Sequence, residues 1–416
     1  MKFRRKLTKQ LPIHSRHLGL NALARVKINV LKKRLLLLLA IRRKIQSTGC
    51  LYSEPLKNAN VLIALLLKQY HDLVFVDSDA VLSVRKRMTI RKIVTIDQFP
   101  EEKIRENFRF TSHQQLLDII QFFQLPEKIR LNNGCVVSSQ TVLMISLFKF
   151  HYPENYNDLE AVFGYDYTIC SRVFNFFLDF MTEHWGYLLL NNLQFWQKSF
   201  PKFAKAIEDR KEHLNVIDPF STMDAFANSK IIGFLDATYF YFCQPEDYEL
   251  QQSVYSGYKK QFGIKFQVAV LPNGMKLHVH SAESARRHDS FILNQSNLLN
   301  HLAANQLNSQ DKFRLHGDPA YGALPPFLSS GGLGRVRVLV EQDFGESKEF
   351  FKMVTFKRAL QLGCEQVVKI YFISFLLHDI FIIFNGSKVG TCCQCLPPTI
   401  EDYVSQGKKK INLIAD

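Results

Sequence analysis

Acidic residues are absent from the first fifty positions of this 416-residue sequence, and the same stretch holds 14 Lys and Arg. The whole chain has 53 Lys and Arg against 38 Asp and Glu, so this basic arm carries nearly all of the net charge of +15. Such an arm is typical of a segment that binds a polyanion or directs nuclear import, although a solvated basic surface has the same composition. Its apolar run at 35–39 is too short to cross a membrane and is not followed by a signal-peptide cleavage pattern, so we expect a basic amphipathic helix.

Cysteines are also few, with 8 in the chain, and their spacing shows no disulfide framework, which favours a reducing compartment. The cluster of Cys392, Cys393 and Cys395 has no matching Cys or His pair at the spacing of a zinc site, so its role stays open. Hydrophobic residues make up 47% of the chain and aromatic residues 12%, which excludes a disordered protein. Length alone suggests two or three domains.

A second long apolar stretch, Val367 to Phe384, lacks the uninterrupted hydrophobicity of a membrane span. It contains Lys369, His378 and Asp379, which would be costly in lipid. The stretch therefore predicts a buried helix near the C-terminus, and we expect no membrane partner.

Residues 138–152 and 155–163 have helical patterns, and Gly164 is a natural stop for the second. A longer helix follows, with one apolar face and a polar face that includes Arg172 and Asn175. This is the outline of a helix-turn-helix, and these polar side chains are of types that reach phosphates or base edges. An ordinary helical hairpin in a core gives the same pattern.

After about residue 230 the pattern changes to strands and helices. Expected strands are 231–242, 263–271, 275–280 and 312–316, of which the second and third form a hairpin; expected helices are 288–304 and one that begins near Arg335 after a Gly/Ser linker at 329–334. This order predicts an α/β fold, with a mixed sheet flanked by helices.

Three carboxylates stand at the ends of these elements. Asp236 and Asp318 each end a strand, and Glu341 lies on the helix that follows, with Arg337 and Lys348 on the same face. Carboxylates that converge need a cation between them, and an all-oxygen set is what Mg²⁺ or Mn²⁺ prefers. Two such ions can promote phosphodiester chemistry. Asp at a strand end that merely meets water is the simpler alternative.

Six motifs extend this reading: "GFLDATYF", "YSGYKKQFGIKFQ", "RRHDSFIL", "GDPAYG", "RVLVEQDFG" and "NGSKVGT…LPPTIEDY". In their order and rough spacing they resemble the PIF/Harbinger-type transposases and Harbinger-derived nucleases, over residues 138–404. The resemblance implies a DDE endonuclease with a ribonuclease-H-like core, preceded by an all-α helix-turn-helix region. It also implies metal-dependent cutting and joining of DNA.

Position by position, the resemblance makes Asp236, Asp318 and Glu341 the catalytic residues and metal ligands, with Asp289 of "RHDS" as an accessory ligand. The implied cofactor is Mg²⁺ or Mn²⁺. The acidic neighbours of Glu341 on its helix, Asp343, Glu346 and Glu349, are expected to face solvent.

Cationic and aromatic residues complete the predicted site. The resemblance makes Arg337 and Lys348 candidates for contacts with DNA phosphates. Tyr258, Lys259 and Lys260, which precede the second strand, are further candidates for DNA binding, although a solvated turn has the same composition.

The sequence departs from the family in the interval from Asp318 to Glu341, which at 23 residues is shorter than usual, as if 325–334 replaced a longer segment. The chain can still reach across this interval. The alternative function is therefore a domesticated DNA-binding or adaptor protein that keeps the fold without turnover.

The predicted organisation is a basic arm and helical region, a helix-turn-helix-like DNA-binding region, a linker, a DDE endonuclease domain and a tail, at 1–110, 111–195, 196–229, 230–385 and 386–416. The expected location is the nucleus. Expected partners are DNA, a separate DNA-binding protein and a second copy of the chain.

Overall fold

The computed structural model describes residues 94–153, 155–190, 193–280, 282–306, 312–363 and 365–405. The chain divides into a unit of residues 1–90 and a unit of residues 91–416, and all described residues belong to the second. The amphipathic helix predicted in the basic arm therefore lies outside the described residues.

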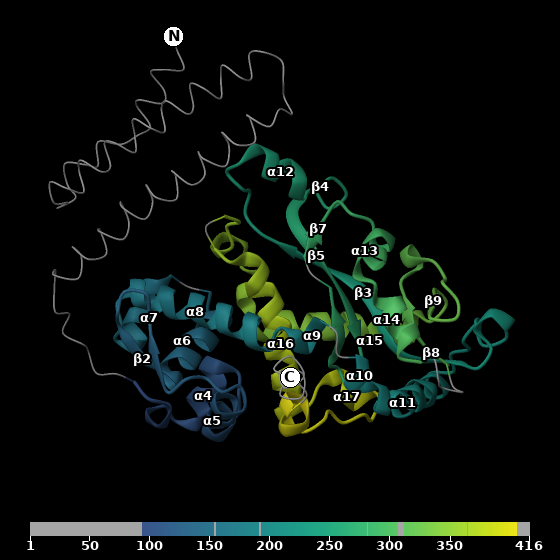
Figure 1. The fold of residues 1–416 in the computed structure, drawn as a ribbon, viewed down its shortest axis with the longest axis horizontal. Coiled ribbons are helices and arrows are strands. Elements are labelled where there is room, and N and C mark those ends of the chain that lie inside the picture. The colour runs from purple at the N-terminus through teal and green to yellow at the C-terminus, as the bar shows by residue number, and fades with distance from the viewer. Residues whose placement is uncertain are drawn as a thin grey trace, which may run out of the picture. The chain divides into compact units, whose positions relative to one another are not determined.

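Short helices form the first part of this unit (Figure 1): η2 Ile96–Gln98, α4 Glu101–Phe108, α5 His113–Phe122, α6 Ser139–His151, α7 Tyr156–Phe163 and α8 Tyr167–Trp185, with the hairpin of β1 Lys128–Arg130 and β2 Val136–Ser138 between α5 and α6. Side chains cap the helices where the sequence offers an acceptor, since Ser138 and Asp166 each accept a backbone N–H from the first turn. Gly164 ends α7 with a φ of 73°. The two predicted helices before Gly164 are thus found within one residue at each end.

A second group of helices leads from α8 to the sheet: α9 Tyr187–Leu190, α10 Leu193–Trp196, η3 Gln197–Ser199, α11 Phe200–His213 and η4 Asp224–Phe226. Pro201 occupies the first turn of α11, where its missing N–H costs nothing. Phe200 at the start of α11 packs edge-on against Phe313 of the sheet, so this helix joins the helical part to the sheet.

The sheet has strands in the order β4-β5-β3-β8-β9, and β6 and β7 pair with the outer side of β5. Their bounds are β3 Ser229–Tyr241, β4 Tyr255–Ser256, β5 Gln261–Val270, β6 Lys276–Val279, β7 Glu283–Ser284, β8 Lys312–Gly317 and β9 Leu328–Ser330. Strands β4, β6 and β7 run antiparallel to β5, and β5 antiparallel to β3, whereas β8 and β9 continue parallel to β3. The predicted α/β fold with a mixed sheet is confirmed.

Two predicted segments differ from the structure. The single helix predicted over 288–304 is two helices, α13 Asp289–Ser296 and α14 Leu298–Ala304, because Asn297 between them takes a left-handed φ of 53°. The linker predicted at 329–334 begins inside β9, which pairs with β8. The remaining elements are α12 Tyr248–Val254, η5 Pro319–Tyr321, α15 Gly334–Phe350, η6 Lys352–Thr355, η7 Lys357–Ala359, α16 Val367–Asn385 and α17 Lys388–Cys392.

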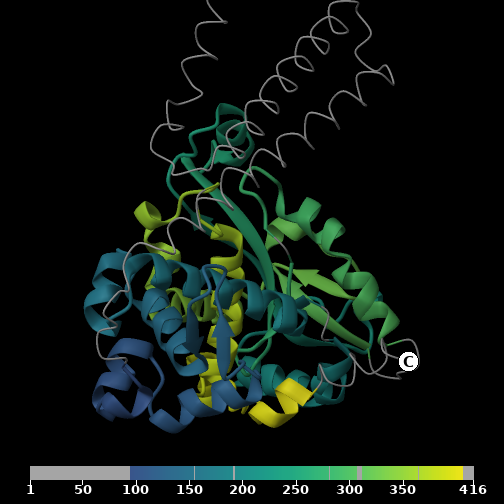
Figure 2. The ribbon, with the colours of Figure 1, turned by 60° about the vertical axis from the view of Figure 1, so that its left-hand side comes forward.

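Helices cover both faces of the sheet (Figure 2). On one face, Phe240 of β3 stacks on Tyr371 of α16 and meets Phe375 edge-on, and α15 contacts the same strand. On the other face, Asp289 at the start of α13 reaches Lys265, whose side chain alternates with those that face α16. The sheet thus has helices on both faces.

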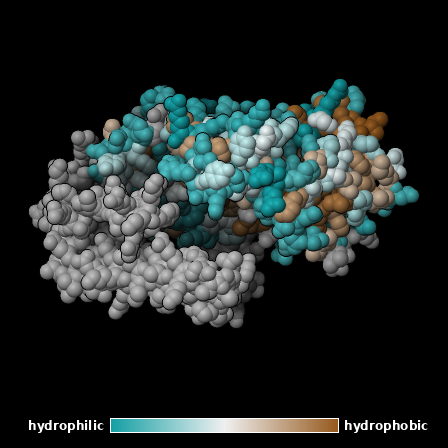
Figure 3. Space-filling view, turned by 90° about the horizontal axis from the view of Figure 1, so that it is seen from above, coloured by the Kyte–Doolittle hydropathy of each residue, from teal (hydrophilic) through white to brown (hydrophobic). Residues whose placement is uncertain are grey.

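The predicted buried helix is α16, which lies in the core. Among the described helices, it alone is long and apolar enough to cross a membrane, but 78% of its most apolar part is buried inside the protein. Its His378 and Asp379 are fully buried. Figure 3 shows that hydrophilic residues dominate one face of the molecule, with hydrophobic residues gathered toward the right-hand end.

Candidate active site

Asp236 and Asp318 are brought together by the pairing of β3 and β8. These strands are parallel, and Leu235 pairs with Gly317, so each aspartate directly follows one member of a pair. Strand β8 ends at Gly317, which opens the edge of β3 beside Asp236. The two carboxylates therefore lie side by side. Asp318 follows the end of its strand as predicted, whereas the prediction that Asp236 ends a strand is wrong, because β3 continues to Tyr241.

Arg337 of α15 joins these carboxylates to the third. Its Nη1 lies 2.9 Å from Asp236 Oδ2, and its Nη2 lies 2.8 Å from Glu341 Oε1 and 3.8 Å from Asp318 Oδ2. Arg337 and Glu341 are one helical turn apart, so both side chains project from the same face of α15. All three predicted catalytic carboxylates thus contact one guanidinium group.

Burial perturbs the carboxyl group of Asp236. Loss of solvent raises its pKa to about 6, against the opposing effects of the Ala237 N–H and of Arg337, and with a smaller rise from Asp318 and Asp289. Its Oδ1 accepts the Ala237 N–H at 2.8 Å. A perturbed carboxyl at an open strand edge is a common mark of a functional site.

A metal ion would have to replace the guanidinium. As they stand, the described residues include no group of three His, Cys, Asp or Glu side chains placed to hold a metal ion. The donor chemistry nevertheless fits a hard divalent cation, because the converging groups are all carboxylates and already require a positive charge between them. Asp236, Asp318 and Glu341 are the residues that would hold it.

The accessory carboxylate Asp289 lies on the other face of the sheet. Its Oδ1 is 2.8 Å from the Lys265 Nζ, and that ammonium also lies over the ring of Tyr239. Asp289 is near enough to Asp236 to raise its pKa. The structure therefore pairs Asp289 with a lysine, and metal ligation by Asp289 stays a prediction.

The other predicted DNA contacts lie along β3 and the turn before β5. Lys348 Nζ donates to Thr238 Oγ1 at 2.9 Å and to the Tyr239 carbonyl at 3.3 Å, and burial lowers its pKa. Lys259 lies over the rings of Tyr239 and Tyr258. Lys260, in the same turn, is exposed.

The helix-turn-helix-like residues stand apart from this set. Asn175 of α8 accepts a hydrogen bond from Gln366 Nε2 at 3.3 Å, and Arg172 is half-buried one turn earlier. No contact among the described residues joins either side chain to the carboxylate site. Their role in DNA binding stays a prediction.

Tyr321 is a residue of the site that the sequence did not single out. It is buried at 4% exposure, and its ring would touch a side chain placed at Gly317. Its hydroxyl has no partner among the described residues, and Asp289, Asp236 and Asp318 add to the effect of burial in raising its pKa. The signal was present, since this tyrosine belongs to the quoted "GDPAYG".

A buried ionic cluster lies on the opposite side of α15 and was also missed. Lys276 Nζ lies 3.0 Å from Asp343 Oδ1 and 3.3 Å from Asp379 Oδ1, and its contact with His378 Nδ1 is 2.6 Å. The expectation that Asp343 and Glu346 face solvent is wrong, because both are buried, Asp343 against Lys276. Glu349 is exposed, as expected. This cluster fixes α15 to α16 and β6, and so fixes the helix that presents Arg337.

The three cysteines at 392, 393 and 395 are not placed to hold a metal ion together with other described residues. Cys393 and Cys395 are buried, and burial raises the pKa of both thiols, that of Cys393 to about 12. They line a cavity that also includes Lys202 and Arg210 of α11.

Residues 235–326 match the family model of the DDE superfamily endonucleases. This segment includes Asp236, Asp289 and Asp318 and ends before Glu341. No curated protein and no solved structure gives a significant match to the chain. The family match supports the DDE superfamily and indicates a nuclease or transposase that has DNA as its substrate.

Proposed function

We propose that the protein is a metal-dependent DNA endonuclease or transposase of the Harbinger-like DDE type. The observation that carries the proposal is the contact of Asp236, Asp318 and Glu341 with one guanidinium group. These carboxylates come from two adjacent parallel strands and a following helix, in the segment that matches the DDE family and just beyond it.

The sheet supports a ribonuclease-H-like core. Strand β3 lies in the centre with an antiparallel neighbour, β5, on one side and two parallel strands, β8 and β9, on the other. This arrangement places the carboxyl end of β8 beside the middle of β3, where Asp236 stands. A helix-turn-helix role for α6 to α8 would add a DNA-binding part to the same unit.

The proposed division of labour follows from the contacts. Asp236, Asp318 and Glu341 would hold Mg²⁺ or Mn²⁺, which would supply activation of the attacking oxygen and stabilisation of the leaving one. Arg337 leaves the carboxylates and contacts a DNA phosphate, for which its forked donors are suited. Lys348 holds the backbone and hydroxyl of β3 next to Asp236, so its charge lies beside the same strand.

The wider setting follows from this activity. DNA is the substrate, and the nucleus is the compartment in which a chain with this basic arm would meet it. From the resemblance to the Harbinger type, we further propose that the protein works with a separate DNA-binding partner and forms a homo-oligomer.

A second candidate is a domesticated DNA-binding or adaptor protein. It is favoured by Arg337 itself, because a guanidinium that satisfies three carboxylates leaves them stable without metal. The short interval between Asp318 and Glu341 also favours it.

Calorimetric titration with Mn²⁺ separates the two candidates. The enzyme is expected to bind Mn²⁺ with an affinity that Asp236→Ala and Glu341→Gln each lower at least tenfold, since each removes a carboxylate ligand. Asp209→Asn, an exposed aspartate on α11, is the matched control and should bind Mn²⁺ as the wild type does. Equal and negligible heats for wild type and variants would favour the adaptor.

A further inference from the structure

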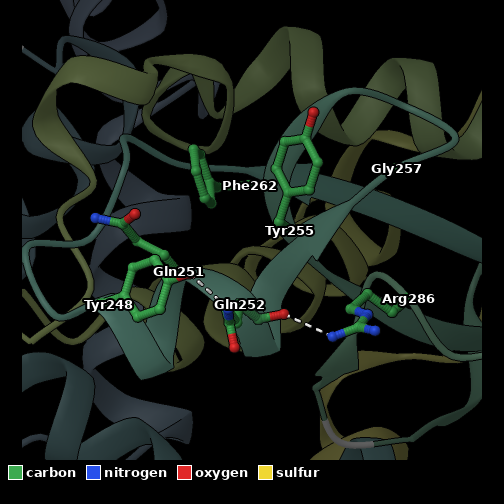
Figure 4. Close-up of a pocket in the computed structure, with 7 residues that line it drawn as sticks. All are labelled: Tyr248, Gln251, Gln252, Tyr255, Gly257, Phe262 and Arg286. Atoms are coloured by element: carbon green, nitrogen blue, oxygen red, sulfur yellow. Dashed lines mark hydrogen bonds between the residues drawn. The ribbon is translucent and has the colours of Figure 1, made fainter.

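An open cavity of about 620 Å³ lies beside α12 and β4, outside the carboxylate site. Figure 4 shows the side chains that line it, which are mostly aromatic rings and amides with one arginine: Tyr248, Gln251, Gln252, Tyr255, Phe262 and Arg286. Its size is in the range of small-ligand sites, about 300–1,000 Å³.

Two of the three aromatic rings of this cavity are exposed, although each ring belongs to a regular element. Tyr248 is 68% exposed and Tyr255 is 40% exposed. Tyr255 lies against Phe262 with ring centroids 5.2 Å apart, so the two rings hold each other in place. Rings that are fixed in position but open to solvent are suited to stacking against a flat ligand.

Two glutamine side chains beside the rings are held by hydrogen bonds through their Nε2 atoms and can still accept hydrogen bonds. Gln252 Nε2 donates to the Tyr248 hydroxyl at 2.8 Å, and Gln251 Nε2 donates to the Pro245 carbonyl at 2.7 Å. The side-chain carbonyl oxygens of both glutamines accept no hydrogen bond from the described residues. Amide carbonyls of this kind can accept from the N–H groups at the edge of a nucleobase.

A second cavity of about 380 Å³ adjoins the first. It shares Gly257 and Arg286 with the first cavity and extends to Tyr239 and Asp289. Tyr239 is on the same strand as Asp236, and Asp289 is close enough to raise the pKa of Asp236. The two cavities therefore form one continuous path that reaches β3 on the face opposite the side chain of Asp236, and none of Asp236, Asp318 and Glu341 lines it.

The charge of this path suits a nucleic acid. Arg286 and Arg287 are exposed along it, and Lys259 lies over the ring of Tyr258. Among the described residues, Asp289 is the sole acid that lines either cavity, and it is already paired with Lys265. Cations that alternate with exposed rings bind single-stranded DNA by phosphate attraction and base stacking.

We infer that the cavity of Tyr248, Tyr255 and Arg286 binds an unpaired nucleobase of a DNA strand. The inference rests on the proposed function for the identity of the strand. The base stacks on Tyr255 and Tyr248, the glutamine carbonyls accept from its edge, and Arg286 contacts the adjoining phosphate. An unpaired base at this position would select strand ends or distorted duplexes over continuous duplex DNA.

The test compares two labelled strands of equal length and charge, an oligothymidylate and an oligomer of abasic sites, by fluorescence anisotropy with the full chain in EDTA. We expect the wild type to bind the oligothymidylate about tenfold more tightly, because only that strand can stack. Tyr255→Ala and the more exposed Tyr248→Ala should each remove most of this preference and leave abasic binding unchanged. Phe356→Ala is the matched control, since Phe356 is 41% exposed and lines neither cavity.

Equal binding of the two strands by the wild type would overturn the inference, as would a preference that both tyrosine variants retain. The measurement needs no metal and no turnover, so it is independent of nuclease activity. If the preference depends on the tyrosines but the protein does not bind Mn²⁺, the base-binding cavity is supported and the proposed nuclease activity is contradicted. If the protein binds Mn²⁺ but shows no preference, the nuclease proposal is supported and the base-binding cavity is contradicted.

Discussion

Arg337 donates from Nη1 to Asp236 Oδ2 at 2.9 Å, across 101 positions of sequence, and so links α15 to the central strand of the sheet. The contact explains how a carboxylate can stand next to the buried run 231–235. A charge in such a place costs several kcal/mol, roughly, unless a cation or donors compensate it. Here one guanidinium and the Ala237 N–H supply the compensation.

Replacement of Arg337 by Gln is expected to destabilise the metal-free protein by about 1–3 kcal/mol, because three carboxylates lose their common cation. Mn²⁺ should restore more stability in the variant than in the wild type, since it no longer competes with the guanidinium. Thermal unfolding in EDTA and in Mn²⁺ measures both effects. Arg335→Gln, an exposed arginine on the same helix, is the control and should change little. A variant as stable as the wild type in EDTA, with the same Mn²⁺ response, would show that the carboxylates do not depend on Arg337.

The ionic cluster beneath α15 gives a second prediction. Lys276→Met should destabilise the protein by about 3–5 kcal/mol in urea unfolding, because it leaves Asp343 and Asp379 buried without a cation. Adding Asp343→Leu should recover part of the loss by removing one of the two acids. The exposed Lys352 provides the control, and its replacement by Met should cost less than about 0.5 kcal/mol. A small effect of Lys276→Met would mean that water reaches the cluster.

The pH dependence of stability is predicted from His278, which is 4% exposed in β6. Burial lowers its pKa to about 4, with smaller effects of His280 and His301, whereas the unfolded chain has the usual value of about 6.5. Below that value the unfolded state gains a proton that the folded state does not, so stability falls as the pH drops toward 4.

Urea unfolding at pH 7.5 and pH 5 of wild type and His278→Gln tests this sign. Between these pH values the wild type should lose about 2 kcal/mol more than the variant. The wild type also contains other buried histidines, so the difference between the two proteins is the quantity to compare. Equal losses would place the pKa of His278 near its ordinary value.

Much of the candidate site could be predicted from the sequence because its carboxylates belong to, or directly follow, elements with clear apolar patterns. Apolar periodicity located β3, β8 and α15, and parallel pairing then brought Asp236 next to Asp318. The contact of Arg337 with all three carboxylates could not be predicted, because helical spacing relates it to Glu341 alone.

The features that could not be predicted from the sequence depend mainly on contacts between segments that are distant in the chain. Strand β9 has the composition of a linker, and its pairing with β8 defines it as a strand. The left-handed turn at Asn297 interrupts a pattern that is helical on both sides. Lys276 lies in a hairpin strand, where a lysine normally meets water. It can be buried because Asp343 of α15 and Asp379 of α16 lie next to its ammonium group.

The most direct test of the proposed function is the nicking of supercoiled plasmid by wild type and Asp236→Asn in the presence of Mn²⁺, with unfolding measured on the same samples. The amide is a poorer ligand for a hard cation but removes a repelling charge, so we expect nicking to be lost while stability is unchanged or slightly higher. Asp209→Asn should nick as the wild type does. Nicking by Asp236→Asn at the wild-type rate and with the same metal dependence would contradict the assignment of Asp236, Asp318 and Glu341 as the catalytic set.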